Sequence, residues 1–156
     1  MSENKAEPIT VLTDDMYTTY RYSYGRAFNR FFQEMRDNAR FVGPRCPSCG
    51  KVLMLPQEFC PVCFVETLDD WVEVPNEGQV KYIVDVTLPF YGQTKPLPYT
   101  FVGVVMEGVE GHIGHFLEEA EKDEIKLDMW VKAVWKPKRE RKGNFFDMKY
   151  WKPIKK

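Results

Sequence analysis

The sequence has few of the residues on which enzyme catalysis usually depends. Its 156 residues include only two histidines, His112 and His115. If both lie in one strand, positions three apart point to opposite faces of the sheet, so the two imidazoles are not expected to act as a pair. Each is expected to be a surface histidine or a hydrogen-bonded one rather than a metal ligand or a general base.

Motifs of the common enzyme classes are also missing. The chain has no Gly-x-Ser-x-Gly elbow, no glycine-rich phosphate loop and no His-Glu-x-x-His pair. If a metal takes all four cysteines, none is left for nucleophilic acyl transfer. The chain is therefore not expected to be a catalyst on its own, and a free-standing small enzyme is the least favoured class.

Long apolar runs are absent as well. No segment approaches the roughly 20 apolar residues that cross a bilayer, and the N-terminus lacks the pattern of a secretion signal. The composition, 44% hydrophobic and 15% aromatic, is typical of a globular protein. We expect a soluble, cytoplasmic protein with no membrane contact, long enough for one domain and a small metal module.

The four cysteines form two Cys-Pro-x-Cys pairs, Cys46 with Cys49 and Cys60 with Cys63. Each turn directs two sulfur atoms at one point, so the two turns together predict a tetrahedral site for Zn²⁺. A closed four-sulfur site has no open position for substrate, which indicates a structural metal. Rubredoxin-like iron uses the same ligands; two disulfides or four free thiols are less favoured, since no secretion signal is visible.

The segment between the pairs is short. Val52 to Leu55 form an apolar stretch that predicts a hairpin arm bringing the two turns together. Gly50 follows the first pair, but Phe64 follows the second. The second turn therefore lacks the residue that most easily adopts a positive φ.

The N-terminal part, residues 1–42, combines a tyrosine cluster with an amphipathic helix. Tyrosines of this kind suit an interface because they bury area and keep a polar tip; they are Tyr17, Tyr20, Tyr22 and Tyr24. Residues 26–38 place Phe28, Phe31, Phe32 and Met35 at helical spacing, which predicts one helix with an apolar face.

The rest of the chain reads as β-structure. A short strand at 71–74 ends the metal ribbon (43–74), and a turn at 75–78 opens the last domain, residues 75–156. Five strands are predicted, at 79–87, 99–106, 112–117, 130–136 and 144–151. Five short strands favour a closed barrel of the OB type. The predicted fold class is mainly β, with an N-terminal helix, a rubredoxin-like zinc ribbon and an OB-fold barrel.

The connections between these strands differ in character. Residues 88–98 contain three prolines and two aromatic residues and predict a stiff apolar loop, whereas 107–111 predicts a glycine-bracketed turn. Residues 118–128 hold six acidic residues and two lysines, which indicates a short solvated helix.

The charge is unevenly distributed. The segment 136–156 has nine basic and two acidic residues, a net charge of +7, while the remainder carries −8. Such a segment can contact phosphate groups of nucleic acid or of a nucleotide-bearing cofactor. A solvated edge strand with a lysine tail is the alternative.

The order of these features resembles the OB-fold zinc-ribbon proteins that accompany thiolases and related acyl-CoA enzymes. The resemblance spans about residues 22–151, with Arg45 to Gly50, Phe59 to Cys63, Gly78 and Pro98-Tyr99 as its more telling pieces. It implies structural zinc on Cys46, Cys49, Cys60 and Cys63.

The resemblance also implies a partner and a ligand. The chain would be an accessory subunit in a hetero-oligomer with a thiolase-fold catalytic subunit, helping to complete a site for a CoA thioester. Basic side chains would meet the CoA phosphates; the candidates are Lys136, Lys138, Arg139 and Arg141. The alternative is a module binding single-stranded nucleic acid, with Trp130, Trp135, Phe145 and Tyr150 stacking on bases, although the acidic body argues against it.

Overall fold

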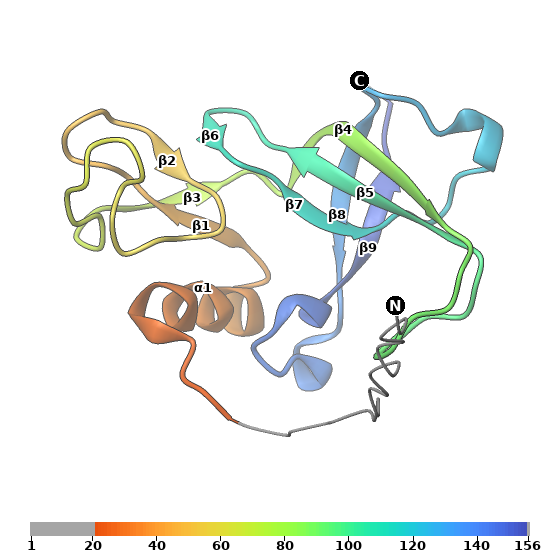
Figure 1. The fold of residues 1–156 in the computed structure, drawn as a ribbon, viewed down its shortest axis with the longest axis horizontal. Helices are drawn as coiled ribbons and strands as arrows, with labels where there is room; N and C mark the ends of the chain where they lie inside the picture. The colour runs from red at the N-terminus through yellow and green to blue at the C-terminus, as the bar shows by residue number, and fades with distance from the viewer. Residues whose placement is uncertain (1–20, 156) are drawn as a thin grey trace, which may run out of the picture.

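A computed structural model describes residues 21–155 (Figure 1). The N-terminal half consists of helix α1 (Gly25–Asn38) and ribbon strands β1 (Phe41–Pro44), β2 (Val52–Leu53) and β3 (Trp71–Val74). The second half holds β4 (Glu77–Val86), β5 (Tyr99–Val105), β6 (Val109–Glu110), β7 (Ile113–Phe116), β8 (Trp130–Trp135) and β9 (Met148–Pro153). Three single 3-10 turns complete it: η1 (Lys122–Glu124), η2 (Lys138–Glu140) and η3 (Phe145–Asp147).

Helix α1 forms where its apolar spacing predicts it. Its inward face buries Ala27, Phe31, Phe32 and Met35. At its N-terminus, the Glu58 carboxylate accepts hydrogen bonds from the Arg26 backbone N–H and the Arg26 guanidinium, each at 3.0 Å. At its C-terminus, the Arg141 guanidinium donates to the carbonyl of Arg36 at 2.8 Å. Both ends of the helix, where backbone groups lack helical partners, are thus tied to other parts of the chain.

The ribbon is joined to the barrel through backbone pairing. Strand β1 pairs with β3 in antiparallel register, and β2 pairs in parallel with β6. The Met54 N–H also donates to the Glu110 carbonyl at 2.8 Å. Residues 107–108 form the expected turn, and Gly108 and Gly111 both have a positive φ. Strand β6, which follows this turn within the same segment, was not predicted. The hairpin arm expected at 52–55 forms only a two-residue strand, whose main partner comes from the barrel.

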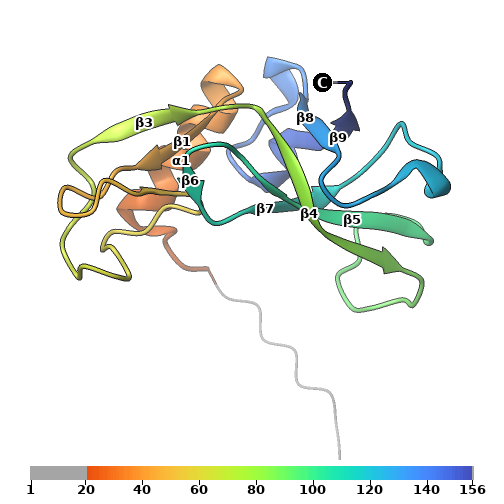
Figure 2. The same cartoon turned by 90° about the horizontal axis from the view of Figure 1, so that it is seen from above.

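The five remaining strands form an antiparallel sheet in the order β7-β5-β4-β8-β9. The ends meet where Leu117 bridges Trp151 in parallel, and the Glu118 N–H donates to the Trp151 carbonyl at 3.0 Å. This arrangement is the closed five-stranded barrel of the OB fold. Figures 1 and 2 show the ribbon and the barrel side by side, with α1 next to the η2–η3 segment.

Three local predictions are wrong in extent. Residues 145–147 form η3 and not the start of a strand, because the Asn144 and Asp147 side chains cap the turn. Residues 118–128 contain only the single turn η1. The connection at 75–78 is shorter than expected, since β4 already begins at Glu77.

One buried core runs through helix, ribbon and barrel. The Phe41 ring lies 4.9 Å from that of Trp135 and 6.0 Å from that of Trp151, which is fully buried. Phe31 and Met35 of α1 belong to the same cluster. The tyrosine cluster is described only in part: Tyr22 and Tyr24 are exposed, and Tyr17 and Tyr20 lie outside the described residues. Within residues 21–155, no helix combines the length and apolarity that a bilayer crossing requires.

Gly78 is required by a close approach of β4 to β5. A Cβ atom at this position would lie 2.4 Å from the Val105 carbonyl oxygen, a backbone atom that cannot turn aside. We expect Gly78→Ala to lower the free energy of unfolding by about 2–3 kcal/mol, measured by urea denaturation. Gly103→Ala is the control, since there the nearest atom belongs to the exposed Tyr82 side chain, which can move. Equal losses in the two variants would contradict this account.

Candidate metal centre and basic cleft

The four cysteine sulfur atoms converge as the two Cys-Pro-x-Cys pairs predict. Their Sγ atoms all lie within 4.8 Å of one another, and those of Cys49 and Cys60 are 3.9 Å apart. A tetrahedral site with Zn–S bonds of about 2.3 Å needs sulfur atoms separated by roughly 3.8 Å. Cys46 and Cys60 are buried, Cys63 is half-buried and Cys49 is exposed. The donor set therefore fits a closed, structural zinc ion.

The two turns have the same backbone hydrogen bonds. Gly50 N–H donates to the Cys46 carbonyl and Phe64 N–H to the Cys60 carbonyl, both at 2.9 Å. Phe64 takes a φ of 57°, in the left-handed region that Gly50 also occupies with 72°. The missing glycine thus leaves the geometry of the second turn unchanged. This conformation costs a residue with a side chain about 1–2 kcal/mol, and the Phe64 ring, 81% exposed, recovers little of it by packing.

Hydrogen bonds within the cage separate the thiol pKa values. The Cys49 backbone N–H points at the Cys46 sulfur at 3.5 Å, and this contact helps to lower the pKa of Cys46 to about 7. The Lys51 N–H lowers the pKa of Cys49, but burial and the neighbouring sulfur atoms outweigh it and raise that pKa to about 11. Four thiols this close resist joint ionisation, and a divalent cation removes that conflict.

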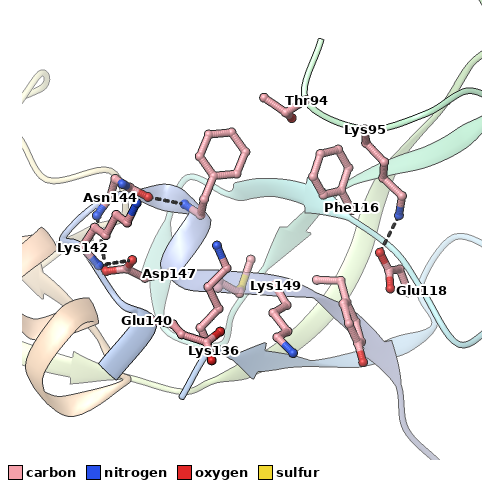
Figure 3. A pocket seen from close by; sticks show the side chains of 13 residues that line it. Thr94, Lys95, Phe116, Glu118, Lys136, Glu140, Lys142, Asn144, Asp147 and Lys149 are labelled. Atoms are coloured by element: carbon pink, nitrogen blue, oxygen red, sulfur yellow. Dashed lines mark hydrogen bonds and ion pairs between the residues drawn. The ribbon is translucent and has the colours of Figure 1, made fainter. Parts of the chain in front are cut away.

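A cleft of about 680 Å³ lies on the barrel between η2–η3, β9 and the loop before β5 (Figure 3). Its apolar lining is Phe116, Phe146, Met148 and Tyr150. Its charged lining is Lys95, Lys136, Lys142, Lys149, Glu118, Glu140 and Asp147. Figure 3 shows Lys142 and Asp147 at one end, Lys95 and Glu118 at the other, and Lys136 and Lys149 between them.

The acidic groups in this cleft are already engaged. Glu118 pairs with Lys95, and Glu140 lies 3.6 Å from the Arg139 guanidinium. Asp147, only 1% exposed, accepts hydrogen bonds from the backbone N–H groups of Lys142 and Gly143, each at 2.7 Å. Three lysines remain without a carboxylate partner among residues 21–155: Lys136, Lys142 and Lys149. The cleft is therefore suited to an anion.

The basic residues singled out from the sequence do not gather at one point. Only Lys136 lines the cleft, whereas Lys138 and Arg139 lie on the exposed turn η2. The Arg141 guanidinium donates to the backbone carbonyls of Lys136 and Arg36, so it holds the fold together. Lys149 was missed, although the alternation of buried Met148 and exposed Lys149 along β9 could have indicated it. No local signal marks Lys142.

The two histidines have different surroundings: His115 lies in β7, whereas His112 lies just before that strand. His112 is exposed, with its ring 4.9 Å from that of Tyr82. His115 is 4% exposed, and neither ring nitrogen has a hydrogen-bond partner among the described residues. The expectation of a surface or hydrogen-bonded histidine therefore holds for His112 and is wrong for His115. The pKa of His115 is lowered to about 4, mainly by burial. The positive charges of Lys136 and Lys95 also lower this pKa, whereas the Phe145 backbone and Glu118 raise it.

His115 should make the stability of the protein depend on pH. Its folded-state pKa lies below the unfolded value of about 6.5, so the unfolded chain binds the proton more readily. The free energy of unfolding should then fall by about 3 kcal/mol as the pH drops from about 6.5 to 4. We expect His115→Leu to remove this part of the loss in urea denaturation curves recorded across that range. An unchanged pH dependence in the variant would exclude His115 as the cause.

The aromatic residues proposed to stack on bases do not form an exposed face. Phe145 packs against Phe32 at 5.0 Å, and Trp135 packs against Phe41 at 4.9 Å. Trp130 and Tyr150 are half-buried, and the Tyr150 hydroxyl donates to Glu119 at 2.7 Å. This placement disfavours the nucleic-acid module.

Comparison with known proteins supports the ribbon and the fold. Residues 34–69 match the family described as ChsH2, rubredoxin-like zinc ribbon domain. No curated protein matches the chain. A solved structure named Ltp2-ChsH2(DUF35) aldolase is similar, with a TM-score of 0.64 and 22% identity, covering 85% of this chain and 98% of that one.

A second similar structure is a protein of unknown function from the DUF35 family of Sulfolobus solfataricus. Its TM-score is 0.60 and its identity 17%, covering 80% of this chain and 83% of that chain. At these identities the two structures establish a shared fold. The mainly β fold class, with one N-terminal helix, a four-cysteine zinc ribbon and an OB-like sheet, is confirmed.

Proposed function

We propose that the chain is a non-catalytic, zinc-containing accessory subunit of a thiolase-type acyl-CoA enzyme complex in the cytoplasm. Its zinc ribbon is a structural part, and its barrel helps to complete the site for a CoA thioester. The catalytic cysteine and histidine belong to a thiolase-fold partner subunit. The supporting likenesses are the resemblance in sequence to thiolase-associated proteins and the structural neighbour whose name joins Ltp2 to a ChsH2(DUF35) component.

The observation that carries this proposal is the set of three lysines around the cleft that have no carboxylate partner in the described part of the chain. CoA has a diphosphate and a 3′-phosphate, and ammonium groups bind phosphate oxygens as mobile point charges. Phe146, which lines the cleft and is 46% exposed, offers an aromatic surface for the adenine ring. We therefore propose Lys136, Lys142 and Lys149 as the main phosphate contacts. The set expected from the sequence was Lys136, Lys138, Arg139 and Arg141, so only Lys136 is common to both.

Binding of CoA to the zinc-loaded chain tests the cleft. We expect Lys136→Gln and Lys149→Gln each to weaken CoA binding about 3- to 10-fold in isothermal titration calorimetry, with a smaller dependence on salt than the native chain. Lys132→Gln, on the exposed side of β8, is the matched control and should bind as the native chain does. If the native chain and the three variants bound CoA with equal affinity, the cleft would not be the CoA site.

Turnover tests the accessory role. The isolated chain should cleave no acyl-CoA, whereas its complex with a thiolase-fold subunit should be active. Benzoylsuccinyl-CoA is the first substrate to assay, because the sequence resembles the small subunit of benzoylsuccinyl-CoA thiolase. A chain that stays monomeric with every candidate thiolase would contradict this role.

A further inference from the structure

A second groove, of about 370 Å³, opens beside the basic cleft. It lies on the outer face of the β4–β5 hairpin and under the loop that follows β4. Its own lining is Val84, Val86, Phe90, Gly92, Tyr99 and Phe101. Thr94, Phe116 and Phe146 line both the groove and the cleft. The two hollows are therefore adjacent and share part of their walls, one with charged lining residues and the other with none.

The groove is an open surface and not a part of the core. Val84 and Phe90 are each 54% exposed, and Phe146 is 46% exposed. Gly114 leaves room for the Phe101 ring that lines the groove: a Cβ atom at position 114 would lie 2.7 Å from that ring. Exposed apolar side chains gathered in one hollow indicate a binding surface.

We infer that this groove binds the acyl group of the CoA thioester whose phosphates bind at the lysines of the cleft, and that it favours large apolar acyl groups over acetyl. This inference rests on the proposed function and names its substrate class. A ligand with a polyanionic head and an apolar tail matches the charged cleft and the apolar groove beside it. The groove volume also falls within the range of small-molecule sites, about 300–1,000 Å³.

Calorimetry with three probes tests the inference on the zinc-loaded full chain: CoA, acetyl-CoA and octanoyl-CoA. Each methylene buried in the groove should tighten binding about fourfold, equivalent to about 0.8 kcal/mol. Burial of only half of the octanoyl chain would then give a Kd at least about 50-fold lower than that of acetyl-CoA.

A neutral substitution separates the groove from the cleft. Val84→Gln places a polar side chain in the groove without adding a charge that would repel phosphates. It should leave the Kd of CoA unchanged within twofold and weaken octanoyl-CoA binding more than 10-fold. Leu127→Gln is the matched control, since Leu127 is 59% exposed and lines neither hollow; it should change neither Kd.

The outcomes distinguish this inference from the proposed function. If CoA binds through the lysines but octanoyl-CoA binds no tighter than acetyl-CoA, the acyl groove is refuted and the proposed function stands. If CoA itself does not bind, both the cleft and the groove assignment fail. If Val84→Gln releases the partner subunit yet leaves octanoyl-CoA binding intact, the groove is a protein interface and the inference is overturned.

Discussion

Replacing Cys60 by serine should abolish metal binding and unfold the ribbon. Cys60 is fully buried, and its sulfur lies 3.9 Å from that of Cys49. In small zinc domains, metal binding contributes about 10–16 kcal/mol of folding free energy, comparable to the whole stability of a typical domain. We expect a loss of more than about 4 kcal/mol in the free energy of unfolding, together with less than one zinc ion per chain by elemental analysis.

Ser48→Ala provides the control for this loss. Ser48 lies in the first Cys-Pro-x-Cys turn, is exposed and supplies no sulfur ligand. The variant should keep one zinc ion and nearly the native stability. If the metal-free Cys60→Ser protein unfolded at the same denaturant concentration as the native protein, the four-cysteine site would not support the fold.

Replacing Asp147 by asparagine should open the loop that lines the basic cleft. The buried carboxylate accepts backbone N–H bonds from Lys142 and Gly143 at 2.7 Å and a longer one from Asn144 at 3.4 Å. The asparagine amide can accept at only one of its two terminal atoms, so a buried N–H loses its partner. Each such loss costs about 1–3 kcal/mol, and the loss of the negative charge adds to it. We expect a decrease of about 3 kcal/mol in the free energy of unfolding.

Glu140→Gln separates this effect from a simple change of charge. Glu140 lines the same cleft, is exposed and lies 3.6 Å from the Arg139 guanidinium. Its substitution should change stability by less than about 0.5 kcal/mol. Amide hydrogen exchange should then quicken at residues 142–147 in Asp147→Asn alone. Equal protection of that loop in both variants would be inconsistent with this role for Asp147.

Local patterns predicted much of the fold. The spacing of the apolar residues fixes the buried face of α1. Alternation predicted that β4 is a strand, but a bulge after Val80 leaves Tyr82 and Val84 exposed. The cysteine spacing was sufficient for the metal ligands, because each pair acts within one turn. Strand β1 was missed because Gly43-Pro44 reads as a break. Gly43 is needed there for another reason: a Cβ atom would lie 2.8 Å from the Leu53 carbonyl oxygen.

The cleft could not be predicted from the sequence in the same way. Its walls come from segments about 50 residues apart, around Lys95 and around Lys142, and only the barrel topology brings them together. The sequence showed a basic C-terminal segment but not which of its charges are used internally. Arg141 is the example, because its guanidinium donates to backbone carbonyls at the end of α1. Nothing in the sequence around Arg141 indicates this contact.

Helix α1 connects the metal centre to the cleft as a strut. Glu58, two residues before Cys60, anchors one end, and Arg141, one residue before the Lys142 wall of the cleft, anchors the other. Because α1 is held at both ends, unfolding of the ribbon should displace the helix and, with it, the loop around Lys142. The Cys60→Ser chain should accordingly lose affinity for CoA, although none of the proposed CoA contacts has been altered. Unchanged affinity would mean that α1 does not couple the ribbon to the cleft.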